Sequence, residues 1–341
     1  MTTNEFAEFH DELRSVAGDV LAKDGDVSWQ ALADAGWTGL EVPEEFGGAG
    51  AGFAESAVIC EEIGRAAAAT GYFGALLACG ALKALAPSDI RDRLLCGTAT
   101  GEVRAAVVPE GFRLENGLLS GTCDFVPDAD GADRLLVVAT VESDVPVLVD
   151  ATGLTVTAQP VLDETRKLAR ISADGMDVAD SAVLLFDGNA HAAVRALLDR
   201  AAVAVACDSL GLAQAMLDAT VAYVKVRSQF DRPIGSFQAV KHACADMSVA
   251  LAVSRQLVGS AVDAVAGGHD AGPAASMAKA YTTAAAVEIA GKAMQLHGGI
   301  GYTWESGIHV YLKRAALNRS LFGSPAAHRQ RLVQRYRARS Y

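Results

Sequence analysis

The sequence lacks the marks of an exported, membrane-spanning or nucleic-acid-binding protein. No apolar run approaches the roughly 20 residues needed to span a bilayer. The first segment, MTTNEFAEFHDELRS, is acidic and lacks the basic start and apolar core of a secretory signal. A formal net charge of −12 disfavours nucleic acid, whose phosphates demand a basic face. We therefore expect a cytoplasmic protein with no membrane and no nucleic-acid partner.

A recognisable metal site is also missing. The 7 histidines are dispersed without an HExxH-like cluster, and the 6 cysteines form no CxxC pair. Without an export signal, these cysteines are most simply reduced, buried and apolar. We expect no metal. The cysteines are Cys60, Cys79, Cys96, Cys123, Cys207 and Cys244.

The 341 residues divide into three zones that differ in their pattern of apolar, polar and turn residues. Residues 1–98 read as helices with apolar stripes. Residues 99–186 contain short β-favouring runs separated by turn residues such as Asn116–Gly117. Residues 187–341 return to long apolar helices of the kind found inside a bundle. The pattern predicts a helical domain, then a small antiparallel sheet or barrel, then a helical bundle.

Local residues also predict several helix ends. Ser28 and Ser88 each precede a helical segment as a candidate N-cap. Gly267–Gly268 stop a long apolar stripe, and Pro273 suits the first turn of the next helix. We expect that helix to end at Gly298–Gly299.

Two C-terminal segments carry the most specific pattern, RSQFDRPIGSFQAVKHACADM (227–247) and QLHGGIGY (295–302). They resemble the acyl-CoA dehydrogenase family, and the resemblance covers nearly the whole chain. Further segments that match the family are WQALADAGWTGLEVPEEFGGAG (29–50), EEIGR (61–65), DADGADRLLVVA (128–139) and DETRKLARI (163–171).

The resemblance implies an α+β, mainly helical fold in three domains. Residues 1–98 would form the N-terminal helical domain, and residues 99–186 a small central antiparallel β domain that is shortened relative to the family. Residues 187–341 would form a C-terminal four-helix bundle that contacts the ADP half of FAD and mediates oligomerisation. The resemblance further implies FAD as cofactor, an acyl-CoA substrate and electron-transfer flavoprotein as electron acceptor.

Three residues of the first segment would reach the ADP half of a flavin held mostly by a neighbouring subunit. The guanidinium of Arg227 can donate two hydrogen bonds to a pyrophosphate. Phe230 can pack against the cofactor, and the Gln238 amide can satisfy a polar edge. Taken singly, Arg227 could instead be a surface charge at a helix end and Gln238 a cap for the next helix.

The second segment would meet the same ADP group. Two adjacent glycines, Gly298 and Gly299, let the backbone approach a ligand and expose amide donors. Gln295, Leu296 and His297 precede them in the family's QxxGG pattern. The alternative is a plain glycine C-cap with Gln295 on the helix surface. We expect His297 to pack or cap rather than to catalyse.

The catalytic base of the family is missing from both places where the family carries it. The family abstracts the α-proton of a thioester with a desolvated carboxylate while a hydride leaves for the flavin. By resemblance, the two positions for that carboxylate are Phe322 and Ala201, and the arginine often found beside the second is Ala202. None of these side chains can accept a proton.

Asp208 is the one acid near these positions that could serve. It lies seven residues after Ala201, about two helical turns further on and on the same face. A lone buried carboxylate is usually paired or functional. Asp208 could be a displaced base or a structural acid paired with an arginine or lysine across the bundle. We favour the structural role, because about 10 Å of displacement exceeds the reach of proton transfer.

The middle zone has lost a second family feature. The TEPxxGSD-like loop that wraps the flavin ring is cut short after AAVVPEGF (105–112). Where the family often has an aromatic and a hydroxyl residue against the ring, this chain has Phe125, Val126 and Pro127.

Three interpretations follow from this pattern. The chain could be the base-lacking subunit of an actinobacterial, steroid-type α2β2 acyl-CoA dehydrogenase, whose partner chain carries the glutamate. It could be a self-sufficient homotetramer that uses Asp208 as base. It could also be a non-catalytic fold relative that stabilises a partner. We favour the first, with a steroid side-chain thioester as candidate substrate. A flavin monooxygenase is disfavoured by the truncated loop.

Overall fold

The computed structural model describes residues 3–22 and 26–338. Its contacts divide the chain into two compact units. Unit 1 comprises Met1–Gly25, Ala57–Ala68 and Ala202–Tyr341, and unit 2 comprises Asp26–Ser56 and Ala69–Ala201. Both units combine segments that are far apart in the sequence, so the three-domain division remains an interpretation of the sequence.

Serine caps begin two helices of unit 2, as the sequence predicted. The Ser28 hydroxyl accepts a hydrogen bond from the Ala31 amide, and the Ser88 hydroxyl accepts one from the Arg91 amide. Each bond satisfies an amide that a helix start leaves without an intrahelical partner. The helical elements of this unit are α2 (Trp29–Asp34), η1 (Glu44–Phe46), the start of α3 (Phe53–Ala66), α4 (Tyr72–Lys83), α5 (Asp89–Thr100), η2 (Asp180–Ala182) and the start of α6 (Ala190–Val226).

The β part of unit 2 is a seven-stranded mixed sheet in the order β5-β6-β2-β1-β3-β4-β7. Every pair in it is antiparallel except β1–β3, so the expectation of a purely antiparallel sheet was wrong at this pair. Strand β2 runs back along β1, and β3 then reverses direction again. Because β3 pairs with β1 on the side opposite β2, β1 and β3 are parallel. The strands are β1 (Ala105–Glu115), β2 (Leu118–Pro127), β3 (Arg134–Val141), β4 (Pro146–Ala151), β5 (Thr155–Ala158), β6 (Leu168–Asp177) and β7 (Val183–Leu184).

Strand β1 runs through the position where the sequence predicted a shortened loop. Only an irregularity between Val108 and Phe112 interrupts its pairing with β3. The chain then turns at Asn116–Gly117 into β2. One face of the sheet buries an aliphatic core that includes Val137 and Ile171, both fully buried. The β part is therefore well formed although it lacks a loop at this place.

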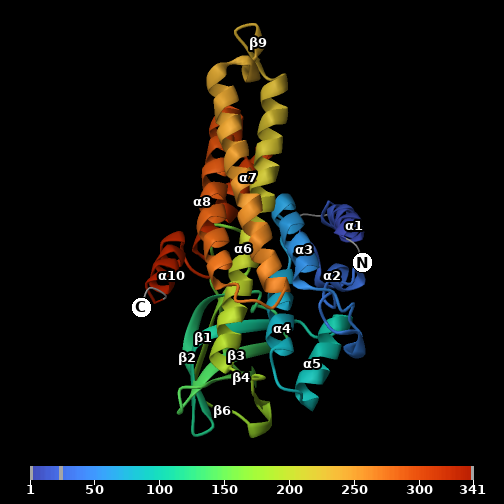
Figure 1. Ribbon diagram of the computed structural model, residues 1–341, viewed down its shortest axis with the longest axis vertical. Coiled ribbons are helices and arrows are strands. Elements are labelled where there is room, and N and C mark those ends of the chain that lie inside the picture. Colours follow the sequence, from blue (N-terminus) through green and yellow to red (C-terminus); the bar gives the residue numbers. More distant parts are fainter. Residues whose placement is uncertain (1–2, 23–25, 339–341) are drawn as a thin grey trace. The chain divides into compact units, whose positions relative to one another are not determined.

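Long helices dominate unit 1 (Figure 1). Helix α8 packs against α7, α9 and α10. Pro273 lies in its first turn and Gly298 caps its end, as expected from the sequence. The elements of this unit are α1 (Thr3–Leu21), the ends of α3 and α6, β8 (Ser228–Gln229), β9 (Arg232–Pro233), η3 (Ile234–Ser236), α7 (Gln238–Ala266), α8 (Gly272–His297), η4 (Gly298–Tyr302), η5 (Trp304–Ser306), α9 (Ile308–Ser320) and α10 (Pro325–Ala338).

Two glycines let α3 and α6 approach each other closely. A Cβ at Gly64 would lie 1.9 Å from the Asp208 carbonyl oxygen, and a Cβ at Gly211 would lie 1.8 Å from the Glu61 carbonyl oxygen. Neither contact can be relieved by a side-chain rotation, because both partners are backbone atoms. The EEIGR segment thus has a packing reason for its glycine.

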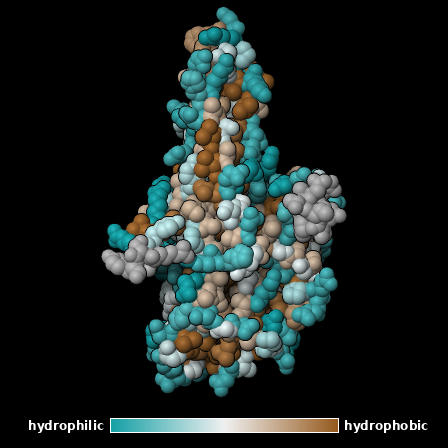
Figure 2. All heavy atoms as spheres, in the orientation of Figure 1, coloured by the Kyte–Doolittle hydropathy of each residue, from teal (hydrophilic) through white to brown (hydrophobic). Residues whose placement is uncertain are grey.

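Helix α7 is long and apolar enough to cross a membrane by length and composition, which the sequence-based expectation had excluded. It is the one such helix among the residues that the structure describes. Its buried residues recur at four- and three-residue intervals, as in a helix that packs one face in a bundle. These residues are Met247, Leu251, Ser254, Val258 and Ala261. Apolar residues also gather on the visible surface of the long helices (Figure 2), and Val249 is 65% exposed.

Candidate functional site

The hairpin β8–β9 joins α6 to α7 and carries the first predicted group of residues. Arg227 follows the last residue of α6, and its carbonyl accepts a hydrogen bond of 2.7 Å from the Ile234 amide. Phe230 is 85% exposed at the hairpin turn, with a left-handed φ of 54°. Gln238 is exposed as the first residue of α7. The hairpin thus presents an arginine and an aromatic ring to solvent.

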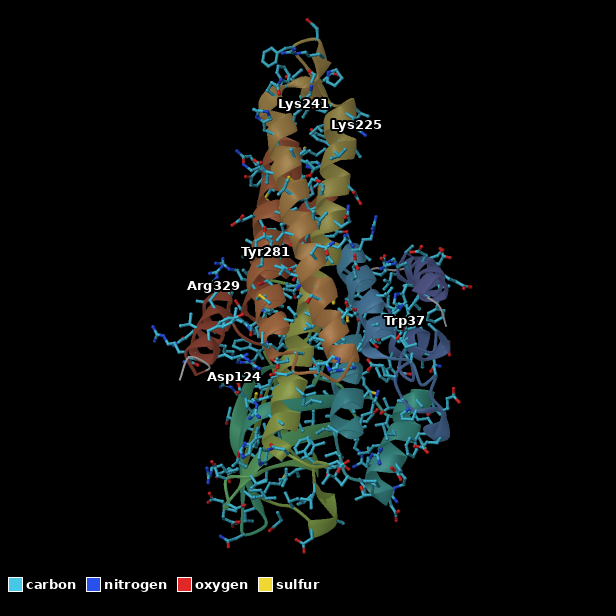
Figure 3. All side chains as sticks on the ribbon, viewed as in Figure 1. Trp37, Asp124, Lys225, Lys241, Tyr281 and Arg329 are labelled. Atoms are coloured by element: carbon cyan, nitrogen blue, oxygen red, sulfur yellow. The ribbon has the colours of Figure 1, made fainter. Side chains whose placement is uncertain are left out.

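Exposed cations surround this hairpin. Lys225, Arg227, Arg232 and Lys241 are all exposed, and Asp231 is the one acid between positions 225 and 241. Figure 3 shows Lys225 and Lys241 on the two helix ends that the hairpin connects. A chain of net charge −12 therefore has a locally positive end, and such a surface attracts an anionic ligand.

Aromatic packing orders the hairpin. The Arg232 guanidinium lies 4.1 Å from the centroid of the Phe237 ring, a cation–π contact. Phe230 meets the same ring edge to face at 6.2 Å. No cation–π contact of Arg227 is found among the described residues, and its side chain is exposed.

The second predicted group lies at the C-terminal end of α8. Gly298 has a φ of 63°, which glycine adopts without strain, and a Cβ at Gly298 or Gly299 would meet nothing within 4 Å. Gln295 is exposed, and its side-chain oxygen accepts a bond of 3.3 Å from Lys292. The two glycines therefore present open backbone to solvent, while Leu296 is half-buried beside them.

A ring stack connects the two groups. His297 lies on Tyr223 of α6 with ring centroids 4.4 Å apart, and the Tyr223 hydroxyl donates to the His297 carbonyl at 3.3 Å. Tyr223 is one helical turn before Arg227, whose amide donates to the Tyr223 carbonyl. The His297 ring is buried, and its Nδ1 lies 2.8 Å from the Ala293 carbonyl oxygen. His297 thus packs and caps, and the end of α8 lies beside the end of α6.

The two positions where the sequence analysis expected the family's base differ in environment. Ala201 and Ala202 are 1% and 0% exposed in α6. Phe322 lies in the turn between α9 and α10, with a left-handed φ of 53°. The turn LFGS (321–324) contains no acid, and its carbonyls accept bonds from Lys279 and His328.

Asp208 is enclosed by positive and polar side chains. Its Oδ1 accepts hydrogen bonds from Arg314 Nε at 3.0 Å and from Asn318 Nδ2 at 2.6 Å. Its Oδ2 accepts one from Arg314 Nη2 at 2.5 Å. The Asp208 and Arg314 side chains are 2% and 0% exposed. Both carboxylate oxygens are therefore engaged in one buried ion pair.

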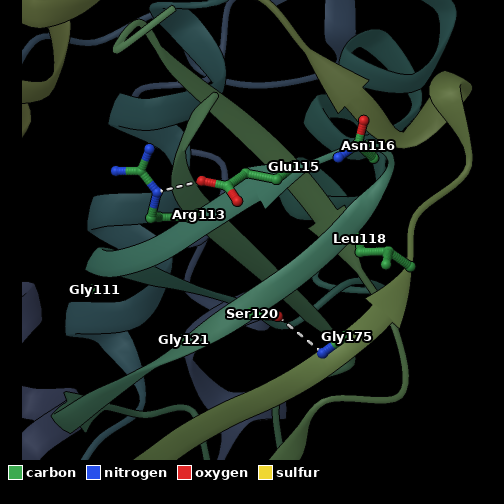
Figure 4. Close-up of a pocket in the computed structure, with 8 residues that line it drawn as sticks. All are labelled: Gly111, Arg113, Glu115, Asn116, Leu118, Ser120, Gly121 and Gly175. Atoms are coloured by element: carbon green, nitrogen blue, oxygen red, sulfur yellow. Dashed lines mark hydrogen bonds and ion pairs between the residues drawn. The ribbon is translucent and has the colours of Figure 1, made fainter. Parts of the chain in front are cut away.

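A hollow of about 430 Å³ lies on the β1–β2 hairpin (Figure 4). Its one ion pair, Arg113 with Glu115 at 2.7 Å, is already formed. The Ser120 hydroxyl accepts from the Gly175 amide at 2.9 Å. These groups satisfy one another, so this hollow is a weaker candidate than the hairpin end of the bundle.

Sequence reasoning missed most of the buried polar network. Arg314, Asn318, Lys279 and His328 are fully buried, although their residue types suggest exposure. One signal was available: Arg314 and Asn318 are four residues apart and so share a face of α9.

Comparison with known proteins places this geometry in a family. The acyl-CoA dehydrogenase N-terminal domain model matches residues 2–102, and the C-terminal domain model matches residues 190–336. The chain is 33% identical to the acyl-CoA dehydrogenase IpdE2 of Mycolicibacterium smegmatis over 305 residues, covering 89% of this chain and 86% of the relative. It is 35% identical to IpdE2 of Mycobacterium tuberculosis over 307 residues, covering 89% and 85%.

Solved structures agree. A variant of the Tcur3481-Tcur3483 steroid ACAD has a TM-score of 0.84 at 29% identity, covering 96% of this chain and 97% of the other. The ChsE4-ChsE5 complex of Mycobacterium tuberculosis has a TM-score of 0.86 at 24% identity, covering 98% and 97%. With two matching domain models and these relatives, the chain belongs to the acyl-CoA dehydrogenase family.

Proposed function

We propose that this chain is the base-lacking subunit of a heteromeric, FAD-dependent acyl-CoA dehydrogenase. It would lend nucleotide-binding residues to a flavin shared with a partner chain, and the partner would supply the glutamate. The observation that carries this proposal is an asymmetry. The hairpin and the glycine turn stand together at a cationic end of the bundle, while alanine and phenylalanine occupy the positions of the base.

The residues present suit an adenine dinucleotide. The Arg227 guanidinium can bind a pyrophosphate with two parallel hydrogen bonds. The open backbone at Gly298 and Gly299 can approach the same group, since a side chain there would obstruct it. Gln238 and Gln295 supply exposed amides. When bound, the flavin would accept the hydride that leaves the β-carbon of the thioester.

Proton abstraction would fall to the partner. Removing an α-proton needs a base within hydrogen-bond reach of the carbon acid. Asp208 is a poor candidate, because Arg314 and Asn318 occupy both of its oxygens. The self-sufficient homotetramer, which requires Asp208 as base, is therefore the less supported alternative.

The named relatives suggest a substrate class. A steroid ACAD and the two-chain ChsE4-ChsE5 complex are among the similar structures. We propose a steroid-derived CoA thioester as substrate and an α2β2 assembly, with electron-transfer flavoprotein as acceptor.

The test is co-expression with a candidate partner, a family chain that retains the glutamate, followed by measurement of flavin per complex. Arg227→Ala should lower flavin content and weaken FAD binding while the complex still assembles, because the pyrophosphate loses a charged bidentate donor. Arg93→Ala is the matched control, since Arg93 is exposed on α5. Unchanged flavin content in Arg227→Ala would contradict the proposed cofactor contact.

A second arm separates the subunit from a mere stabilising relative. In the proposed function, flavin content rises when the two chains are mixed and dehydrogenase activity appears only then. A complex that assembles without any rise in flavin would favour the stabilising role.

A further inference from the structure

Two buried side chains contact the turn between α9 and α10, and a third supports one of them. Lys279 of α8 is fully buried, and its Nζ donates to the Gly323 carbonyl at 2.8 Å and to the Arg319 carbonyl at 3.5 Å. His328 of α10 is also fully buried, and its Nε2 lies 2.9 Å from the Phe322 carbonyl oxygen. Its Nδ1 lies 3.2 Å from the Ser276 hydroxyl of α8. We name Lys279, Ser276 and His328 the clasp.

The turn depends on this support. Phe322 has a left-handed φ of 53° and Gly323 a φ of 102°. A phenylalanine in this region costs on the order of 1 kcal/mol or more and persists only where its surroundings hold it. The Gly323 position also has no room for a side chain, because a Cβ would lie 2.9 Å from His328 Nε2. The hydrogen bonds of the clasp therefore hold a conformation that the sequence disfavours locally.

The clasp contains no anion. Its hydrogen-bond partners are the carbonyls of Arg319, Phe322 and Gly323 and the hydroxyl of Ser276. The charged group of α10 that acts on both Lys279 and His328 is Arg331, which is itself a cation. α9 contributes a carbonyl, and α8 contributes Lys279 and Ser276. Burial and the nearby positive charge of Arg331 therefore both disfavour the protonated forms of Lys279 and His328.

The titration of both groups reflects this environment. Burial, with a further contribution from Arg331, lowers the pKa of Lys279 from 10.5 to about 7. Burial likewise lowers the pKa of His328 from 6.5 to about 4, although its bond to the Phe322 carbonyl opposes the change and Lys279 and Arg331 add to it. In both cases the folded state binds its proton less readily than the opened state, so protonation favours opening.

We propose that the clasp is a pH-sensitive joint that positions the Leu321–Ser324 turn and the start of α10 on α8, and that acidification releases it. Release would free the turn where the family carries its base, together with a helix that presents the exposed Arg329, Arg331 and Arg337. The inference goes beyond the proposed function, since it concerns contacts within this chain and holds with or without a shared flavin.

The test is hydrogen exchange of the full chain, read by mass spectrometry from pH 8 to pH 4 and corrected for the intrinsic pH dependence of exchange. Peptides covering residues 319–330 should lose protection as pH falls through the range from 6.5 to 4. Their opening constant should rise roughly 100-fold across that range, the scale set by a pKa of about 4 in place of 6.5. Residues 134–141 of β3 should keep their protection.

The key variant is His328→Gln, whose amide can still donate to the Phe322 carbonyl but does not titrate. It should abolish the rise between pH 6.5 and 4. His242→Gln is the matched control, because His242 is exposed on α7, and it should behave like the unaltered chain. A merely structural role for His328 would change protection equally at every pH.

Two outcomes would overturn the proposal. One is an identical pH response in His328→Gln and the unaltered chain. The other is parallel loss of protection in β3, which would mean that acid unfolds the chain as a whole. Circular dichroism at pH 8 verifies that each variant is folded, and Lys279→Met provides an independent arm. In a second exchange series from pH 7 to pH 10, this variant should lack the rise in protection with pH that the unaltered chain shows.

Discussion

Replacing Asp208 separates a structural carboxylate from a catalytic one. In the unaltered chain, the Arg314 guanidinium has 0% exposure and also donates to the Ala68 carbonyl at 2.9 Å. Asp208→Ala would remove its carboxylate partner and leave the buried charge with that carbonyl. Breaking one side of such a buried pair typically costs 3–5 kcal/mol, because the remaining charge is left uncompensated. We expect a loss of about 3–5 kcal/mol in the free energy of unfolding, measured by urea denaturation with circular dichroism.

A matched control lies on the same helix. Asp218 also pairs with an arginine, Arg65, at 3.1 Å, but the two side chains are 49% and 48% exposed. Asp218→Ala should cost less than about 1 kcal/mol, as exposed pairs do. The double variant Asp208→Leu/Arg314→Met should recover most of the loss, since apolar replacement of both partners removes the buried charges together.

Activity supplies the second measurement. In the proposed heteromer, an Asp208→Asn variant that still folds should retain its turnover per bound flavin, because we assign proton abstraction to the partner. Retained stability together with abolished turnover in Asp208→Asn would refute this reasoning and restore Asp208 as the base.

Two further predictions concern packing and pH. Gly211→Ala should destabilise the chain by about 2 kcal/mol or more, because its Cβ would meet a backbone carbonyl. Gly291→Ala is the control: a Cβ there meets nothing within 4 Å, so the variant should be neutral or more stable by up to about 1 kcal/mol. Thermal unfolding of the two variants compares them. Stability should also rise with pH above about 7, since the folded-state pKa of Lys279 lies below its ordinary value of 10.5. Lys279→Met should flatten that rise, and Lys292→Met, an exposed lysine on the same helix, should leave it intact.

Many helix ends could be predicted from the sequence because they depend on residues close to them in the chain. The capping hydroxyls of Ser28 and Ser88, the proline at position 273 and the glycines that end α7 and α8 all act within a few residues of themselves. The parallel β1–β3 pairing was not readable in this way. The alternation of apolar residues along β1 is compatible with either β2 or β3 as a neighbour. Which strand pairs with which, and in which direction, depends on the whole sheet.

In the candidate site, too, local patterns could be predicted from the sequence and long-range contacts could not. The hairpin and the glycine turn were readable as separate patterns, but their proximity depends on a stack between Tyr223 and His297, 74 residues apart. Asp208 could be named as a structural acid, but its partner Arg314 lies 106 residues away. Contacts of this range leave no periodic trace in the sequence.

The most direct test of the shared-flavin account is an equilibrium titration of FAD into the purified chain, alone and then with its partner. The account predicts weak binding and no dehydrogenation of acyl-CoA by the lone chain, with stoichiometric flavin and turnover only in the mixture. Stoichiometric FAD and full turnover in the lone chain would contradict it.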